Sequence, residues 1–323
     1  MRSTNKNLRA GITIMMLVAS MSLTSCGKRV GTTAVVPTPS VAPQSSIPVE
    51  DLSNTYNQTT NIEAVANGTP NAQISSFKVD QATFSAWQAK GIAVSGGTIY
   101  VSVADTKGLL QYGSVIKMGS SDGKSWKNIG TAFLGLSHPI SKTVQGLAIS
   151  GNTLLAVDSA KSYIIDASKA KVTVVKTTSG TDVAAGGSSV FIANGSTVSK
   201  TDSSLASSTP IIGLTATGGI GADNQGNVYA VSGVTIKKAD LTNQVQDVVT
   251  TNLASPIDVA VDSRNGDLYV LDGTMIKRFT SSGQLSVSFS SSATKPVAIT
   301  VDEGGAVYVA DQGSSNKDSQ ILK

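Results

Sequence analysis

The sequence predicts an all-β protein in which six four-stranded antiparallel units close into a six-bladed β-propeller, preceded by a signal peptide and a disordered tether. Three observations predict this fold. Short apolar strands alternate with glycine-containing turns, one pattern recurs along most of the chain, and no long segment between strands shows the period of about 3.6 residues that marks an amphipathic helix. Because no helices separate the strands, a βαβ architecture is excluded.

A signal peptide is expected at residues 1–25. Basic residues precede an apolar stretch, GITIMMLVASMSL, and small or mildly polar residues follow it. This order of basic, apolar and small segments is typical of export signals. No apolar run of about 20 residues occurs after residue 26, so the mature chain is not expected to cross a bilayer.

Cys26 is the single cysteine of the chain, so no intramolecular disulfide can form. The tetrapeptide Leu23-Thr24-Ser25-Cys26 resembles the lipobox of bacterial lipoproteins, in which an aliphatic residue and two small residues precede a cysteine. The resemblance implies cleavage before Cys26 and lipidation of its thiol and new amine, with acyl chains such as palmitate as the membrane anchor. The alternative is an ordinary export signal that happens to end near a cysteine.

The expected location is the cell envelope, with the membrane as a partner through the N-terminal lipid. Each buried CH₂ of an acyl chain contributes about 0.8 kcal/mol, so two or three chains anchor stably. Gly27, rather than an aspartate, follows the cysteine. The lipoprotein resemblance then implies the outer membrane, or the cell membrane if the organism has only one. Residues 26–69 are rich in Pro, Ser, Thr and Asn and are expected to form a flexible tether.

The folded domain is expected at residues 70–323, where small or aliphatic first strands, glycine turns and apolar second strands recur. A glycine turn between two apolar strands predicts an antiparallel hairpin. Successive units begin 36 to 40 residues apart after a first interval of 55, which is close to the length of a propeller blade. The six units start near residues 91, 146, 182, 219, 258 and 298.

The last unit ends after its third strand, which would leave the ring open with an unpaired sheet edge. Residues 74–79, with the sequence ISSFKV, alternate apolar and polar side chains and precede the first unit. We therefore expect this segment to close the ring as the outer strand of the last blade.

The fifth unit shows the repeat most clearly, with PIDVAVD at 256–262, NGDLYVLD at 265–272 and MIKRF at 275–279. It resembles an NHL repeat, whose pattern is Pro-x-Gly-Ile-Ala-Val-Asp, then Gly-x-Val-Tyr-Val-Ala-Asp, then Arg-Ile. Residues 296–311 match this pattern as well. The resemblance covers roughly residues 90–323 and implies an NHL-like or gluconolactonase-like propeller. It implies no single function, because this fold hosts lyases, lactonases, receptors and scaffolds.

Asp182 and Asp258 are the candidate ligand-binding or metal-binding residues, because both stand at equivalent starts of inner strands, near one mouth of the central channel. Two carboxylates with asparagine neighbours could hold Ca²⁺, which prefers oxygen ligands. Gluconolactonase-like propellers hold a metal through Glu, Asn and Asp, so the resemblance implies the same. The alternative is that both aspartates cap turns or are solvated. The other four equivalent positions weaken the match, because they are Gly91, Gly146, Gly219 and Ala298.

His138 is the only histidine, which excludes metal sites built on several histidines. Virginiamycin-lyase propellers use a histidine base, so His138 is a weaker catalytic candidate, with an exposed loop residue as the alternative. Residues 120–126, SSDGKSW, resemble a shortened Asp-box of sialidase-like propellers, a structural hairpin between third and fourth strands. Asp158, Asp272 and Asp311 end second strands and are expected to be turn residues.

A nucleic-acid partner is not expected. Three of the basic residues, Arg2, Lys6 and Arg9, precede Cys26, so the formal charge of the mature chain falls from +4 to +1. No convincing catalytic set is visible. The expected function is therefore a non-enzymatic binding or scaffold domain for a protein, peptide or glycan, without a cofactor unless Ca²⁺ binds. The alternative is a metal-dependent propeller enzyme of the lactonase or lyase type.

Overall fold

The computed structural model describes residues 76–77, 87–105, 114–119, 127–129, 144–315 and 319–323. The chain divides into two units, Met1–Glu50 and Asp51–Lys323, and every described residue belongs to the second. The expected signal peptide, the lipidation site at Cys26 and the tether lie outside the described residues, as do His138 and the segment 120–126. Within the described ranges, no helix is long and apolar enough to span a membrane.

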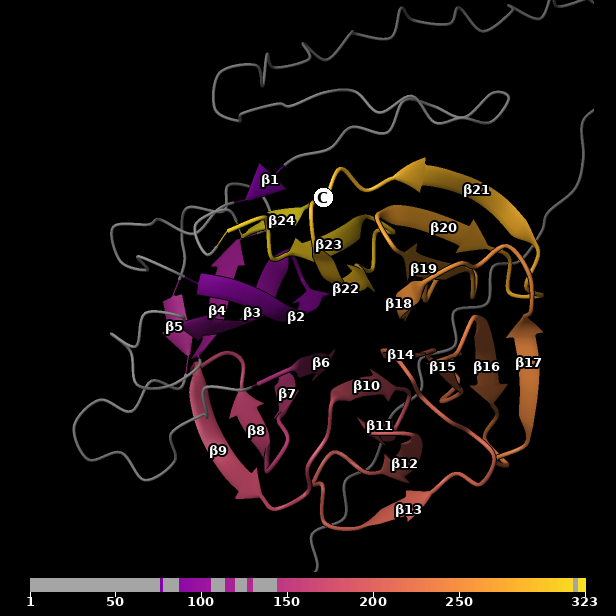
Figure 1. The fold of residues 1–323 in the computed structure, drawn as a ribbon. Helices are drawn as coiled ribbons and strands as arrows, with labels where there is room; N and C mark the ends of the chain where they lie inside the picture. Colours follow the sequence, from indigo (N-terminus) through magenta and orange to yellow (C-terminus); the bar gives the residue numbers. More distant parts are fainter. Residues whose placement is uncertain (1–75, 78–86, 106–113, 120–126, 130–143, 316–318) are drawn as a thin grey trace, which may run out of the picture. The chain divides into compact units, whose positions relative to one another are not determined.

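Six four-stranded antiparallel sheets surround a common centre, with one strand of each sheet innermost (Figure 1). Blade one contains β2 (Trp87–Ser95), β3 (Thr98–Asp105), β4 (Ser114–Gly119) and β5 (Lys127–Ile129), and blade two contains β6 (Gly146–Ser150), β7 (Thr153–Val157), β8 (Ser162–Asp166) and β9 (Lys171–Lys176). Blade three contains β10 (Asp182–Gly186), β11 (Ser189–Asn194), β12 (Thr197–Thr201) and β13 (Ser208–Pro210), and blade four contains β14 (Ile220–Ala222), β15 (Val228–Ser232), β16 (Thr235–Ala239) and β17 (Val245–Val249). Blade five contains β18 (Pro256–Val261), β19 (Leu268–Asp272), β20 (Met275–Phe279) and β21 (Leu285–Ser290), and blade six contains β22 (Pro296–Val301), β23 (Val307–Asp311), β24 (Gln320–Leu322) and β1 (Ser76–Phe77). The predicted all-β, six-bladed propeller of four-stranded antiparallel blades is confirmed.

The sixth sheet is built from both ends of the folded chain. Its strand order is β1-β24-β23-β22, and β1 pairs antiparallel with β24, placing Ser76 opposite Leu322 and Phe77 opposite Ile321. The outer edge of β24 is therefore covered by a strand that precedes blade one in the sequence. Pairing this edge removes a row of free backbone groups on which another chain could add a strand.

The apolar core is divided among the interfaces between neighbouring blades. Among the described residues, buried side chains form six clusters, and each draws its members from two adjacent blades. One cluster joins Ile99 and Met118 of blade one to Tyr308 and Ile321 of blade six across the closure of the ring. No blade buries both faces of its sheet alone, so the ring is the unit that folds.

The NHL-like spacing has a structural reason at the turn between first and second strands. In blade six, Oδ1 of Asp302 accepts hydrogen bonds from the amides of Gly304 (2.9 Å) and Ala306 (2.8 Å), and Oδ2 accepts one from the hydroxyl of Tyr308 (3.0 Å). Gly305 has a φ of 86°, a left-handed conformation that glycine adopts without strain. The order of aspartate, glycine and tyrosine within the repeat therefore builds one hydrogen-bonded turn.

Of the three aspartates that end or follow second strands, Asp158 and Asp311 make the expected turn bonds, and Asp272 and Asp311 hold a connection between blades. Asp158 accepts hydrogen bonds from the amides two and three residues later, and Asp311 accepts one from the amide of Gly313. Asp272 accepts the amides of residues 254 and 255 and pairs with Lys277, and Asp311 also accepts the amides of residues 294 and 295. Asp272 and Asp311 thus hold the connection that arrives from the preceding strand, a role that depends on tertiary contacts and is invisible to local turn patterns.

Candidate functional site

The six inner strands enclose a cavity of about 1380 Å³. Its lining extends from the residues where these strands begin to the residues where they end. We call the first opening the start mouth, lined by Lys90, Gln145, Thr181, Gly218, Ile257 and Val297. We call the second the end mouth, lined by Ser95, Ser150, Gly187, Asn224, Ser263 and Glu303.

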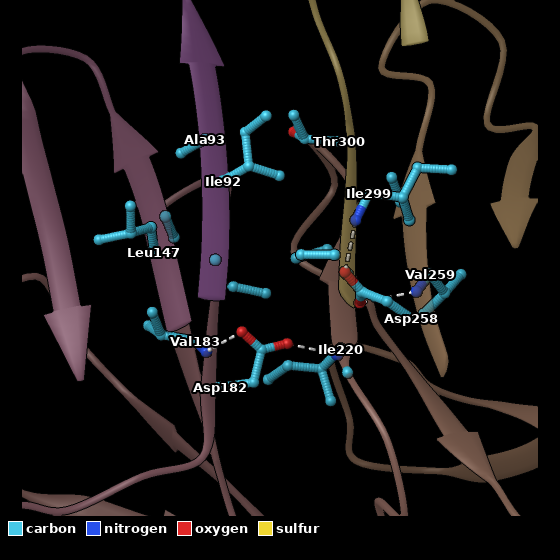
Figure 2. A pocket seen from close by; sticks show the side chains of 18 of the residues that line it. Ile92, Ala93, Leu147, Asp182, Val183, Ile220, Asp258, Val259, Ile299 and Thr300 are labelled. Carbon is cyan, nitrogen blue, oxygen red and sulfur yellow. Dashed lines mark hydrogen bonds between the residues drawn. The ribbon is translucent and has the colours of Figure 1, made fainter. Parts of the chain in front are cut away.

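The structure brings Asp182 and Asp258 together in this cavity, although they lie on blades three and five. Figure 2 shows both carboxylates between the inner strands, among aliphatic side chains from several blades. They stand at equivalent positions of the inner strands, which we call the inner ring. It consists of Gly91, Gly146, Asp182, Gly219, Asp258 and Ala298, and all of these except Gly146 line the cavity.

Each carboxylate joins its own blade to the next one. Oδ1 of Asp182 accepts the amide of Val183 (2.8 Å), and Oδ2 accepts the amide of Ile220 on blade four (2.7 Å). Asp258 repeats the arrangement, with the amide of Val259 at 2.7 Å and the amide of residue 299 on blade six at 2.8 Å (Figure 2). These bonds fix the position of both carboxylates, and each oxygen still has a lone pair that can accept another hydrogen bond.

The glycine at position 219 allows the two carboxylates to approach each other. A Cβ atom on Gly219 would overlap Oδ1 of Asp258 and lie 3.1 Å from Oδ2 of Asp182, and one on Gly146 would lie 2.6 Å from Oδ1 of Asp182. The oxygens nearest Gly219 are therefore within the roughly 4–6 Å over which like charges raise each other's pKa. Gly146 and Gly219, two of the residues that weakened the sequence match, thus leave the space that the paired carboxylates occupy, whereas Gly91 lies against the backbone oxygen of Gln145.

Both carboxyl groups resist ionisation. Burial raises the pKa of Asp182 to about 6, although the amides of Ile220 and Val183 oppose this shift. Burial, and next the negative charge of Asp182, raise the pKa of Asp258 well above its ordinary value. Asp258 is 8 % exposed, whereas Asp182 keeps more contact with the cavity. Asp182 is therefore the carboxyl that ionises first, and its charge makes ionisation of Asp258 harder.

The described residues do not fit the calcium site that the resemblance implies. Ca²⁺ takes about six to eight oxygen ligands, usually including several carboxylates. Within the described ranges, no three His, Cys, Asp or Glu side chains lie close enough together to hold a metal ion. The pair offers two carboxyl groups, whose raised pKa values oppose the doubly ionised state that would bind a cation best, and all four oxygens already accept hydrogen bonds from backbone amides.

Sequence reasoning missed a second feature of the cavity, an aliphatic collar three residues beyond the inner ring on every inner strand. The signal was present, because the residue at this position is aliphatic in all six units. The collar consists of Val94, Ile149, Ala185, Ala222, Val261 and Val301, and all six line the cavity.

No family model matches the sequence, and no curated protein matches it. Several solved structures share the fold. A gluconolactonase from Xanthomonas campestris is 13% identical, with a TM-score of 0.60 over 83% of this chain and 96% of that chain. A luciferin-regenerating enzyme is 12% identical, with a TM-score of 0.52 over 73% of this chain and 90% of that chain. The calcium-binding protein regucalcin from Agrobacterium tumefaciens is 9% identical, with a TM-score of 0.52 over 73% of this chain and 89% of that chain.

These comparisons contradict the expectation of a non-enzymatic binding or scaffold domain. Among the structures that share the fold across nearly their whole length are a gluconolactonase and a luciferin-regenerating enzyme. That expectation rested on the missing histidine and serine motifs, and it treated Asp182 and Asp258 only as ligand or metal candidates. At these identities the similarity establishes architecture, and the chain has the six-bladed fold of gluconolactonase-like propellers.

Proposed function

We propose that this protein is a propeller enzyme of the lactonase or lyase type. Of the two, we favour the lactonase reaction, hydrolysis of a lactone or ester at Asp182 and Asp258. One observation carries the proposal: two carboxyls of unequal acidity face the same cavity, held by backbone amides. Environments that separate the pKa values of two neighbouring carboxyls assign one as base and the other as acid.

The reaction follows from this inequality. Asp182, as carboxylate, accepts a proton from a water molecule while the water oxygen bonds to the carbonyl carbon of the substrate. Asp258, as carboxyl, donates its proton to the alkoxide oxygen when the acyl–oxygen bond breaks, so the products are a carboxylic acid and an alcohol. One proton has then moved from Asp258 to Asp182, and transfer between the two adjacent groups restores the starting state. Positioned acids and bases of this kind contribute about 10²–10⁴ in rate.

The test is a hydrolysis assay of the full chain on lactones and esters, by pH-stat titration of the released acid. Asp182→Asn and Asp258→Asn should each lower kcat by about 100-fold or more, the contribution of one positioned acid or base. Asp247→Asn is the matched control, since Asp247 lies on outer strand β17 with its side chain 50% exposed. Normal activity in either channel variant would refute the assignment.

Treatment with a chelator separates this mechanism from a metal-dependent one. We expect EDTA to leave kcat unchanged, because the acid and base are both side chains of the protein. Loss of activity in EDTA with recovery on adding Ca²⁺ would show that a metal carries the reaction.

We also propose that the enzyme is held at the cell envelope by lipid on Cys26, with the outer membrane as its location in a diderm bacterium. The support is the order of basic, apolar and small residues before Leu23-Thr24-Ser25-Cys26 and the polar stretch after it. An anchored enzyme of this kind would act on molecules that reach the envelope from outside the cytoplasm.

A further inference from the structure

The aliphatic collar lies at a fixed distance from the carboxyl pair. Its six residues each follow an inner-ring residue by three positions, and a strand rises about 3.3 Å per residue, so collar and pair are separated by about 10 Å along the strands. Five collar side chains keep part of their surface accessible; the exception is Val94, which is 6% exposed. A ligand that reaches the pair from the end mouth must therefore pass several aliphatic side chains.

The lining offers no platform for a sugar ring. Among the described residues that line the cavity, none is Phe, Tyr or Trp. Sugar rings bind proteins by packing their C–H faces on aromatic side chains and by hydrogen-bonding their many hydroxyls. The collar supplies neither contact, so a polyhydroxylated substrate would lose its hydration there without replacement.

The charges of the lining also disfavour an anionic substrate. At the end mouth the charged lining residue among those described is Glu303, whose carboxylate accepts hydrogen bonds from the hydroxyl of Ser95 (2.6 Å) and the amide of Gly96 (3.3 Å). The one lysine of the described lining, Lys90, lies at the start mouth, before the inner ring. An anion among the collar residues would thus have acidic groups on both sides, and a carboxylate product would be repelled from Asp182.

We propose that the end mouth accepts an uncharged lactone or ester with an aliphatic chain, its chain against the collar and its carbonyl group at Asp182 and Asp258. The inference rests on the proposed function and names its substrate class. It separates this protein from an enzyme for sugar lactones, because the collar stabilises buried methylenes and none of its six side chains can hydrogen-bond a hydroxyl.

The experiment measures kcat/KM of the full chain in nanodiscs for γ-lactones with alkyl substituents of increasing length, and for glucono-δ-lactone. Each added methylene should raise kcat/KM about fourfold, which is the fold-change that corresponds to about 0.8 kcal/mol per buried CH₂. The gain should stop when the chain extends past the collar, and glucono-δ-lactone should be the poorest substrate. A preference for glucono-δ-lactone, or no dependence on chain length, would overturn the inference.

A collar variant tests the contact itself. Val261→Thr keeps the side-chain shape but replaces a collar methyl with a hydroxyl, so kcat/KM should fall about tenfold for long-chain lactones and by a much smaller factor for unsubstituted γ-butyrolactone. Val234→Thr is the matched control, because Val234 is 55% exposed and lies outside the described cavity lining. Each lactone partitions into the nanodisc lipid to the same extent for every variant, so this effect cancels when the kcat/KM of a variant is divided by that of the wild type for the same lactone. An equal fall for short and long substrates would contradict a contact with the chain.

A non-hydrolysable probe separates failure of the substrate class from failure of the proposed function. Alkyl-substituted γ-lactams present a similar ring and should bind, by calorimetry, with an affinity that rises with chain length. If lactams bind in this way but no lactone or ester is hydrolysed, the collar assignment stands and the proposed function fails. If lactones are hydrolysed at Asp258 but neither kcat/KM nor lactam affinity depends on chain length, the function stands and the substrate class is wrong.

Discussion

Replacing Asp182 with asparagine should flatten the dependence of stability on pH between about pH 4.5 and pH 8. In the folded protein the pKa of Asp182 is raised from 3.8 to about 6, and the charge of Asp182 also raises the pKa of Asp258. Between the unfolded and folded pKa values the native state holds more protons than the unfolded state, so the free energy of unfolding decreases as pH rises. The asparagine side chain cannot ionise, and its neutrality also lets Asp258 ionise more readily.

The size of this decrease in the free energy of unfolding follows from the pKa shift of Asp182. Each unit of pKa corresponds to about 1.4 kcal/mol, so the full effect of Asp182 is about 3 kcal/mol, of which about 2 kcal/mol falls between pH 4.5 and pH 8. For a domain of this size about 1 kcal/mol shifts Tm by roughly 2–4 °C, which gives a decline of about 4–8 °C in the wild type. The aspartates whose pKa values are lowered in the folded state, such as Asp262 and Asp272, lose their contribution below about pH 4, outside this window.

Guanidinium unfolding of the full chain at pH 4.5, 6 and 8, followed by circular dichroism, measures this slope. The asparagine variant can lose the hydrogen bond from the backbone amide of Ile220, but that loss changes stability equally at every pH. The readout is therefore the slope of the unfolding free energy against pH and not its absolute value. Asp247→Asn, on the exposed outer strand β17, should keep the wild-type slope. A wild type whose stability is constant or increases over this range, or a variant with an unchanged slope, would refute the account of the carboxyl pair.

Three further predictions concern the ring and the anchor. Gly219→Ala should destabilise the domain by about 1–3 kcal/mol, because the added methyl overlaps the carboxylate of Asp258, and an unchanged denaturation midpoint would contradict the close approach. Deleting residues 70–80 should lower Tm sharply and promote aggregation on size-exclusion chromatography, because β24 would lose β1 as its partner; an equal Tm would show that this pairing is dispensable. Cys26→Ser should abolish incorporation of labelled palmitate and release the protein from the membrane fraction, whereas labelling that persists would disprove the lipidation site.

The blades were predictable because their information is local. A strand with period two followed by a glycine turn and a second apolar strand is encoded within about fifteen residues, and the segment 256–272 directly predicts β18 and β19. The turn at Asp302 and Tyr308 is also local, since the residues it joins are only six positions apart. Local patterns no longer suffice at the next level, where residues from different repeats have to be combined.

The sequence by itself determined the repeat, the number of blades and the two aspartates worth attention, because each unit carries its own pattern of apolar and turn residues. Only the tertiary structure decided that Asp182 and Asp258 meet across Gly219, that burial raises the pKa of both carboxyls, and that six aliphatic residues form a collar beyond them. The physical reason is that distances between blades, and the burial that closure of the ring imposes, exist only when all six sheets share one axis. No local pattern records which inner strands face each other or how far water reaches between them.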